Sequence, residues 1–317
     1  MLYVIAGATA SGKTAVAIEL ARLTNGEVIS ADSMQVYRGL DIGTAKPTRD
    51  ERAGIPHHLL DVVNPDEAFS VAQYQAMANA AIADIRTRGR TPILAGGTGF
   101  YINAVVYETA FAGEVGETQS HKTAHENTLR DQYAALAIEK GAAYLHDLLT
   151  ARDPAAAQAV HANNIKRVAR ALAFCETNGT LFSTHNALQR SKRTLALPPD
   201  TRFIVLTHPR DALYDRINAR TDHMLHSGFV QEVQGLLAAG YSPGLPAMQA
   251  IGYREVVRAI QHGIDPQSTY VRDEIAQATR RYAKRQTTWF NNSSPHAVYV
   301  DASSGDAPTI AQNIVNI

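Results

Sequence analysis

The sequence predicts an α/β fold, a parallel sheet layered with helices, into which an all-helical domain is inserted. In the first hundred residues, short apolar runs typical of buried strands alternate with runs typical of helices, and this alternation favours a parallel sheet. From about Phe111 to Arg193 the strand pattern disappears, and alanine-rich, helix-favouring runs replace it. We therefore expect a core formed by residues 1–110 and 194–317, and a helical insertion formed by residues 111–193.

Apolar runs, and the residues that interrupt them, predict the elements of the first hundred residues. Strands are expected at Leu2–Ala6, Glu27–Ser30, His58–Val63 and Thr91–Ala95. One helix is expected from about Lys13 to Leu23. A second helix is expected to run to about Arg88 from Ser70, a residue type that favours the N-cap position. The stretch from Ser33 to Pro56 contains Gly and Pro, so it predicts a loop.

The last third of the chain continues the sheet and then becomes helical. Arg202–Leu206 predicts another core strand, and Ala297–Val300 predicts a short last strand. Helices are expected near residues 210–225, 228–239, 252–262 and 270–290. With 317 residues, of which 45% are hydrophobic and 19% charged, the chain can bury a normal core.

The charge is balanced overall but unevenly distributed. The formal net charge is zero, and residues 1–100 hold nine Lys and Arg against ten Asp and Glu. Residues 161–193 hold Glu176 as their one acidic residue, against Lys166, Arg167, Arg170, Arg190, Lys192 and Arg193. A local basic patch on a neutral protein suits selective contact with a phosphate backbone. A solvated basic helix face is the alternative interpretation.

Cysteine content and hydropathy exclude several classes of protein. The single cysteine, Cys175, excludes an intramolecular disulfide and a multi-cysteine zinc site. The apolar run Leu2–Ala6 is too short for a signal peptide or a membrane span, and no other segment reaches the necessary length. We therefore expect a cytoplasmic protein without a membrane partner.

The stretch GATASGKT matches the phosphate-binding pattern GxxxxGK[ST] and lies between a predicted strand and a predicted helix, the context that this pattern requires. Its residues are Gly7, Ala8, Thr9, Ala10, Ser11, Gly12, Lys13 and Thr14. The glycines let backbone N–H groups converge on an anion, the helix start adds partial positive charge, and Lys13 adds a full charge. The hydroxyl of Thr14 would hold Mg²⁺, directly or through water.

Two further turns are expected at the same edge of the sheet. Asp32 ends the second predicted strand, where ligands of α/β sheets bind. A carboxylate repels phosphate, so its useful roles there are to organise Mg²⁺ or to accept a proton from a nucleophile. Alone, a solvated Asp or a helix cap explains it equally well. The stretch GGTGFY (Gly96–Tyr101) places the hydroxyl of Thr98 at a helix start, although a plain tight turn is the alternative.

Taken in order, these motifs resemble the tRNA dimethylallyltransferase family, also called tRNA isopentenyltransferases. The matching stretches are GATASGKT, ADSMQVYRGLDIGTAKP, PHHLLDVVNPDEAFSVAQY, GGTGFY, LYDRINARTDHMLHSGFVQEV, AIGYRE and AKRQTTWF, which extend over roughly residues 3–290. The resemblance implies a P-loop kinase-like parallel sheet core with an inserted helical domain. It implies transfer of a dimethylallyl group from dimethylallyl diphosphate to N6 of the adenosine 3′ to the anticodon (A37), in tRNAs that read codons beginning with U.

The resemblance also implies roles for individual residues. Asp32 would be the general base, Gly7–Thr14 the diphosphate cradle, and Thr98 a hydroxyl near the reacting centre. Arg216 or Arg220 would clamp the diphosphate. Contacts with the tRNA anticodon stem-loop are implied for Asp32, Ser33, Met34, Gln35, Thr98, Arg130, Lys166, Arg167, Val168, Ala169, Arg170, Gln249, Ala250, Ile251, Gly252, Tyr253, Arg254, Lys284, Arg285, Gln286 and Trp289.

Three features depart from the family pattern. Ala8 stands where Pro is usual in the phosphate loop. The insertion begins with FAGEVGETQSHKTAHENTLR, of which only Leu129 and Arg130 align with the family. The cysteine count leaves no set of ligands for the zinc finger of the eukaryotic members, so the resemblance is to the bacterial type.

The implied reaction predicts a role for the helical insertion in binding the tRNA. An adenine stacked in the anticodon loop cannot reach a buried donor, so the enzyme has to extrude it, at a few kcal/mol. A helical domain with Lys166, Arg167 and Arg170 would provide a second grip on the stem-loop. The basic residues before Trp289 suit RNA as well, although packing of Trp289 against the core is the alternative. Because each chain would carry a complete site, we expect a monomer.

Three rival functions share parts of this pattern. A small-molecule kinase would use the phosphate loop, the acidic residue and the arginines, but it has no need of a basic helical insertion. A prenyltransferase acting on free AMP or ATP has no need of a stem-loop grip. A non-enzymatic RNA-binding protein would not require Lys13, Thr14 and Asp32 to be intact.

Overall fold

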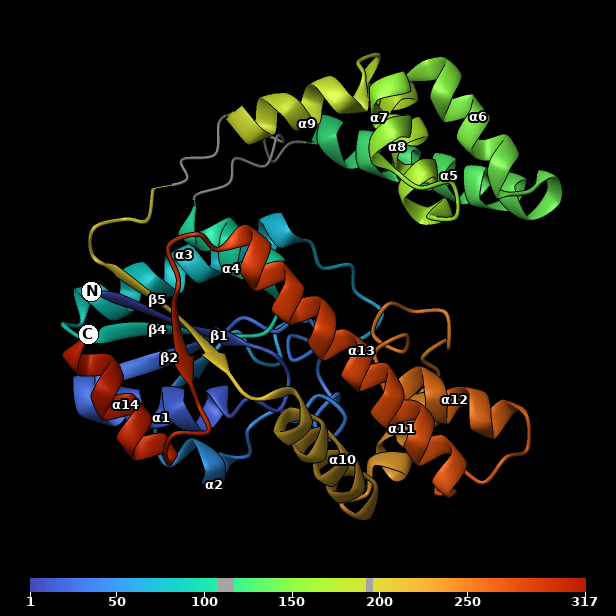
Figure 1. Ribbon diagram of the computed structural model, residues 1–317. Coiled ribbons are helices and arrows are strands. Elements are labelled where there is room, and N and C mark those ends of the chain that lie inside the picture. Colours follow the sequence, from blue (N-terminus) through green and yellow to red (C-terminus); the bar gives the residue numbers. More distant parts are fainter. Residues whose placement is uncertain (108–116, 192–195) are drawn as a thin grey trace. The chain divides into compact units, whose positions relative to one another are not determined.

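The computed structural model describes residues 1–107, 117–191 and 196–317 (Figure 1). The chain forms two compact units. One consists of Met1–Glu108 and Ala196–Ile317, and the other of Thr109–Leu195. We name the first unit the core and the second unit the insertion.

Within the described residues of the core, six strands form a single sheet in the order β3-β2-β4-β1-β5-β6. The strands are β1 (Leu2–Gly7), β2 (Gly26–Ser30), β3 (His57–His58), β4 (Thr91–Gly96), β5 (Thr201–Thr207) and β6 (Val298–Asp301). Every pairing is parallel, so the predicted α/β class is confirmed. Parallel strands place all of their carboxyl ends at one edge, where β1, β2 and β4 each end in a turn of interest.

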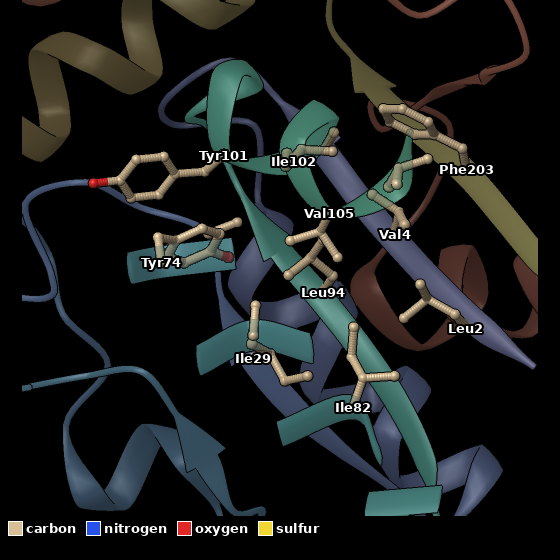
Figure 2. Close-up of a cluster of buried hydrophobic side chains, with 14 of the residues drawn as sticks. Leu2, Val4, Ile29, Tyr74, Ile82, Leu94, Tyr101, Ile102, Val105 and Phe203 are labelled. Atoms are coloured by element: carbon tan, nitrogen blue, oxygen red, sulfur yellow. The ribbon is translucent and has the colours of Figure 1, made fainter. Parts of the chain in front are cut away.

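One face of the sheet packs on α3 (Val71–Thr87), α4 (Gly99–Val106) and the end of α13 (Thr269–Ser293). Side chains alternate along β1, and Leu2, Val4 and Ala6 face this side. Figure 2 shows Val4 and Leu94 facing Ile102 and Val105 of α4. At the same face, the rings of Tyr74 and Tyr101 stack 4.0 Å apart. This packing fixes the start of α4, which follows the turn that carries Thr98.

The opposite face packs on α1 (Lys13–Thr24) and α14 (Ala307–Asn316). Tyr3 and Ile5 of β1 point to this side, against buried residues of both helices such as Leu20 and Ile314. The β1–α1 connection is the phosphate loop, so both elements that flank it are held by the same apolar cluster.

Four further helices belong to the described part of the core. They are α2 (Arg49–Arg52), α10 (Arg210–His226), α11 (Phe229–Ala238) and α12 (Tyr253–Gln261). Helices α10 to α13 share a second apolar cluster with Val36, Tyr37 and Leu40, which belong to the long loop that follows Asp32. This cluster is the reason that a loop of this length has one defined path.

The insertion contains α5 (Glu117–Lys140), α6 (Ala142–Arg152), α7 (Pro154–Ala159), α8 (Ile165–Asn178) and α9 (Phe182–Ser191). Its own apolar cluster is built from buried residues that include Leu145, Leu149, Leu172 and Cys175. Cys175 is therefore a small core residue of the insertion. In the described parts of both units, no helix combines the length and the apolarity that crossing a membrane requires.

The predicted strand His58–Val63 is wrong, because β3 contains only His57 and His58. Leu59 and Asp61 adopt positive φ angles of 61° and 56°, which break an extended strand. Val63 instead forms an isolated parallel bridge with Tyr37. Two helices were not predicted. α2 lies within the predicted loop and begins with a capping box at Thr48, and α14 follows the last strand.

Candidate active site

Three turns converge at the carboxyl edge of the sheet, after β1, β2 and β4. The turn after β4 lies directly against the turn after β2: Ser33 N–H donates to Thr98 Oγ1 at 3.0 Å, and Thr98 N–H donates to Ala31 O at 3.1 Å. The two turns are this close because Gly96 has no side chain. A Cβ there would lie 2.1 Å from Ala31 O. The structure therefore brings Asp32 and Thr98 together, as the resemblance implies.

The turn after β1 is the phosphate loop, and its backbone requires the two glycines of the motif. Gly12 has a φ of 84°, and a Cβ on Gly7 would lie 2.6 Å from Leu206 O. Lys13 Nζ donates to Ala8 O at 2.6 Å, so the ammonium group lies over the loop. Ser11 Oγ is buried and has no hydrogen-bond partner within the described residues. An anion in the loop would supply an acceptor for both groups.

Lys13 has an unusual electrostatic environment. Burial, and then the positive charge of Arg220, lower its pKa from 10.5 to about 7, although Asp32 acts in the opposite direction. A bound dianion would compensate both effects and restore the charge on the ammonium group. The loop is thus electrostatically prepared for an anionic ligand.

Two arginines of α10 reach the phosphate loop from one helix face, because they lie four residues apart. Arg216 Nε donates to Ala10 O at 2.7 Å, and Arg220 donates from a terminal nitrogen to Thr9 Oγ1 at 3.0 Å. Burial lowers the pKa of Arg220 and the charge of Asp32 opposes the shift, which places these two side chains in one electrostatic environment. Arg220 therefore contacts the loop and lines the same cavity as Asp32.

Arg220 lines two cavities. The first, of about 250 Å³, is lined by Thr9, Asp32, Ser33, Met34, Gly43, Thr44, Arg220, Thr221, Met224, Gln249, Ala250, Ile251, Ile275, Thr279, Tyr282 and Arg285. The second, of about 580 Å³, is lined by Ala10, Gly12, Lys13, Thr14, Ala15, Ile18, Ala45, Pro47, Glu51, Arg216, Ala219 and Arg220. We name them the Asp32 cavity and the phosphate-loop cavity. Arg220 lines both, so ligands in the two cavities would meet beside it.

The side chains of the phosphate-loop cavity could coordinate a hard divalent cation only if a phosphate ligand supplied further oxygen atoms. Within the described residues, no three His, Cys, Asp or Glu side chains gather into a metal site. Thr14 is exposed at the start of α1, and its hydroxyl oxygen lines the phosphate-loop cavity. Diphosphate oxygens and water would have to complete the coordination.

Tyr282 is a site residue that sequence reasoning missed. It lies on α13, lines the Asp32 cavity and is near the side chains of Thr98 and Gln286. Burial, and then the charge of Asp32, raise its pKa to about 12, so its hydroxyl remains protonated. Nothing in its spacing distinguished Tyr282 from other aromatic residues on α13.

Gln286 connects two of the turns and does not face outward. Its amide Nε2 donates to Gly97 O at 2.9 Å, and its Oε1 accepts from Thr9 N–H at 2.8 Å. The side chain is buried, so the RNA contact implied for it is replaced by a bracing role between the phosphate loop and the Thr98 turn.

Other residues implied to contact RNA are divided by the structure into buried and exposed positions. Val168, Ala169, Gly252 and Tyr253 are buried, and Ala250 is buried beside the Asp32 cavity. The exposed or partly exposed positions are Ser33, Met34, Gln35, Arg130, Lys166, Arg167, Arg170, Gln249, Ile251, Arg254, Lys284, Arg285 and Trp289. The side chains of the second group are accessible at the surface, and Ala250 is accessible only from the Asp32 cavity.

Trp289 packs against the core and also remains partly exposed, so both interpretations of its sequence context, core packing and RNA contact, stay open. Its ring packs over Gly99, where a Cβ would lie 2.2 Å from the indole, and it meets Phe100 edge-on at 6.4 Å. It nevertheless remains 38% exposed, and Phe100 is 41% exposed. The pair forms an aromatic surface at the start of α4.

The insertion presents its own cationic group. Lys166, Arg167 and Arg170 follow one another on α8, and α5 contributes Arg130. Partial desolvation, and then the charge of Arg130, lower the pKa of Arg170, which indicates that the two guanidinium groups lie near each other. Arg130 also forms an ion pair with Glu126. The side chains of Arg190, Lys192 and Arg193 lie outside the described residues, as does most of the atypical stretch at the start of the insertion.

Comparison with known proteins places this site in a family. The sequence profile of the IPP transferase family matches residues 35–293. A tRNA dimethylallyltransferase of Desulfitobacterium hafniense is 41% identical over 315 residues, which are 99% of this chain and 96% of that protein. The structure of the full-length tRNA isopentenylpyrophosphate transferase from Bacillus halodurans is similar with a TM-score of 0.70 and 39% identity, over 99% of this chain and 94% of the other.

A eukaryotic dimethylallyltransferase, described as acting on tRNA, is similar with a TM-score of 0.77 and 27% identity, over 99% of this chain and 77% of the other. The matches therefore extend over the core and the insertion alike. The profile match alone spans well over half of the chain, and this protein belongs to the IPP transferase family, the tRNA dimethylallyltransferases.

Proposed function

We propose that this enzyme transfers a dimethylallyl group from dimethylallyl diphosphate to N6 of A37, the adenosine 3′ to the anticodon, in tRNAs that read codons beginning with U. The observation that carries the proposal is the pair of cavities that Arg220 lines. One contains the phosphate loop and the other contains Asp32. The diphosphate of the donor occupies the phosphate loop, and the extruded adenine enters the Asp32 cavity.

In this reaction the bond between the allylic C1 and its diphosphate oxygen breaks, and a bond between C1 and N6 forms. Adenine N6 is a poor nucleophile because its lone pair is delocalised into the ring. Departure of the diphosphate is assisted by Lys13, Arg220 and the loop amides, which stabilise the charge that develops. The carboxylate of Asp32 accepts the proton that N6 loses.

Asp32 is held for this role by the turn that it begins. Its Oδ1 accepts the N–H of Met34 at 2.9 Å, which leaves Oδ2 for the substrate. Thr98 Oγ1 already accepts from Ser33 N–H and donates to Ser33 Oγ at 3.3 Å, so it orients this turn and lies beside the reacting centre.

We further propose Mg²⁺ as the cofactor. The hydroxyl of Thr14 and the diphosphate oxygens would hold it, and it would neutralise part of the charge on the leaving group. We also propose that the reaction takes place in the cytoplasm. We propose a monomer, because one chain supplies every group named above.

Label transfer tests the function. Purified protein, Mg²⁺ and radiolabelled dimethylallyl diphosphate are expected to label an unmodified anticodon stem-loop and not free AMP. The matched control is the same stem-loop with guanosine in place of A37. Label on free AMP, or on the guanosine control, would refute the proposal. Labelling of neither RNA nor nucleotide would refute it as well.

The cationic group of the insertion is proposed to bind RNA phosphates. Lys166→Gln and Arg170→Gln are each expected to weaken stem-loop binding and to reduce the slope of log K against log salt concentration by about one unit. The measurement is a titration of labelled stem-loop at several salt concentrations. Lys140, the last residue of α5, provides the control. The variant Lys140→Gln should keep the wild-type slope. Unchanged slopes in the two test variants would assign Lys166 and Arg170 to a solvated helix face.

A further inference from the structure

Glu232 of α11 binds three consecutive backbone N–H groups of the loop that follows Asp32. Its Oε2 accepts from Asp41 at 3.1 Å and from Ile42 at 2.7 Å, and its Oε1 accepts from Gly43 at 3.2 Å. Successive N–H groups of this kind form a concave site for an anion. Here the anion is a side chain of the protein itself, more than 180 residues distant in the sequence.

The same carboxylate also holds a second segment. The buried hydroxyl of Tyr253 donates to Glu232 Oε1. Tyr253 begins α12 and is separated by Gly252 alone from Gln249–Ile251, which line the Asp32 cavity. Burial, and then the charge of Glu232, raise the pKa of Tyr253 far above its ordinary value, so the phenol remains a donor.

The loop packs tightly against the start of α12 at Gly43. A Cβ on Gly43 would lie 2.4 Å from the rings of both Phe229 and Tyr253. Gly43 and the adjacent Thr44 line the Asp32 cavity. Two walls of this cavity, Gly43–Thr44 and Gln249–Ile251, are therefore attached to one carboxylate that lies behind them.

A chain of hydrogen bonds connects this attachment to Asp32. The side-chain amide of Gln35 donates to the carbonyl oxygens of Thr44 and Ala45, each at 3.2 Å. The backbone N–H of Gln35 in turn faces Asp32 Oδ1 at 3.4 Å. A shift of residues 41–44 would therefore be transmitted to the turn that orients the carboxylate of Asp32.

We propose that Glu232 is a positioning residue for the acceptor base: it fixes the separation of the two walls that enclose an extruded purine and keeps Asp32 aligned with it. Glu232 does not line the Asp32 cavity and does not touch the substrate. The inference rests on the proposed function, because it assigns the Asp32 cavity to the acceptor and the phosphate loop to the donor.

Glu232→Gln tests the inference with almost no change in volume. Each carboxylate oxygen accepts from two donors, so an amide in either orientation places its NH₂ group against two donors. The matched control is Glu67→Gln. Glu67 accepts the single N–H of Asn64 at 2.6 Å on an exposed loop, and the amide oxygen of Gln can retain this bond.

Three experiments are made: steady-state kinetics (kcat and KM) with an unmodified anticodon stem-loop, a titration that gives the Kd of dimethylallyl diphosphate, and hydrogen exchange of the 36–47 backbone. In Glu232→Gln, we expect kcat/KM for the RNA to fall about 30-fold or more, with donor Kd within about twofold of wild type. Exchange at residues 41–43 should accelerate, whereas Glu67→Gln should match wild type in all three. Tyr253→Phe removes one of four donors and should show a smaller loss of the same kind.

The inference is overturned if kcat/KM for RNA in Glu232→Gln equals that of Glu67→Gln. It is also overturned if donor affinity falls in parallel, because that result indicates general loss of structure. If Glu232→Gln does not fold, Tyr253→Phe decides between the same outcomes. A wild-type enzyme without label transfer would refute the proposed function instead, and unchanged exchange at residues 41–43 would then still overturn the attachment of the loop by Glu232.

Discussion

Asp32→Asn is expected to lower kcat for prenyl transfer by about 10²–10⁴-fold, the contribution of a positioned general base. Asn keeps the volume of the side chain and an oxygen that can accept from Met34 N–H, a bond of 2.9 Å in the wild type. What Asn cannot do is take the proton from N6. Binding of both substrates should therefore persist while the chemical step fails.

Single-turnover transfer of label and separate binding titrations with stem-loop and donor measure this outcome. The matched control is Asp265→Asn, because Asp265 accepts the N–H of the residue two positions on, Gln267, at 2.9 Å in a turn of the same kind. Asp265 does not line the Asp32 cavity. Near-normal turnover in Asp32→Asn would remove Asp32 as the base, and a parallel loss of RNA binding would make its role one of folding the turn.

Positions in the fold that depend on neighbours in the sequence were predictable. The phosphate loop and the turns at Asp32 and Thr98 each follow a strand, and parallel strands bring such turns to one edge. Hydrophobic spacing could not show the end of β3, because it depends on positive φ angles at Leu59 and Asp61. An apolar run predicts a strand whether or not its backbone can adopt an extended conformation.

Residues whose role depends on distant partners were not predictable. Lys46 is an example, because a lysine in a loop is ordinarily placed at the surface. In the structure its side chain is 3% exposed, and Nζ meets Asp41 at 2.5 Å and Asp61 at 2.6 Å. Glu232 and Tyr282 were also not predictable, because the residues that they contact lie in other elements. Gln286 was selected for RNA contact by resemblance, but its bonds to Thr9 and Gly97 become visible only in the fold.

Lys13→Met is expected to lower kcat/KM for dimethylallyl diphosphate by about 10²–10³-fold, comparable to removal of one preorganised donor to a developing negative charge. Met keeps an unbranched apolar stem of similar length, so the stem can retain its packing while the charge is lost. Lys13→Arg keeps a cation and serves as the matched variant. A loss in Lys13→Met no larger than that in Lys13→Arg would contradict a role for the charge.

The pH dependence of donor binding follows from the same side chain. The pKa of Lys13 is about 7 without ligand, so above this pH the free enzyme carries a neutral amine, whereas the diphosphate complex favours the ammonium form. Binding must then take up a proton, and wild-type affinity should fall by up to about tenfold per pH unit above pH 7 until the pKa of the complex is reached. Calorimetry at pH 8.5 in buffers of different ionisation enthalpy should detect uptake approaching one proton in the wild type. The ionisation of the donor itself is common to all variants, so Lys13→Met and Lys13→Arg should lack this additional uptake, and equal uptake in all three would assign the titration to another group.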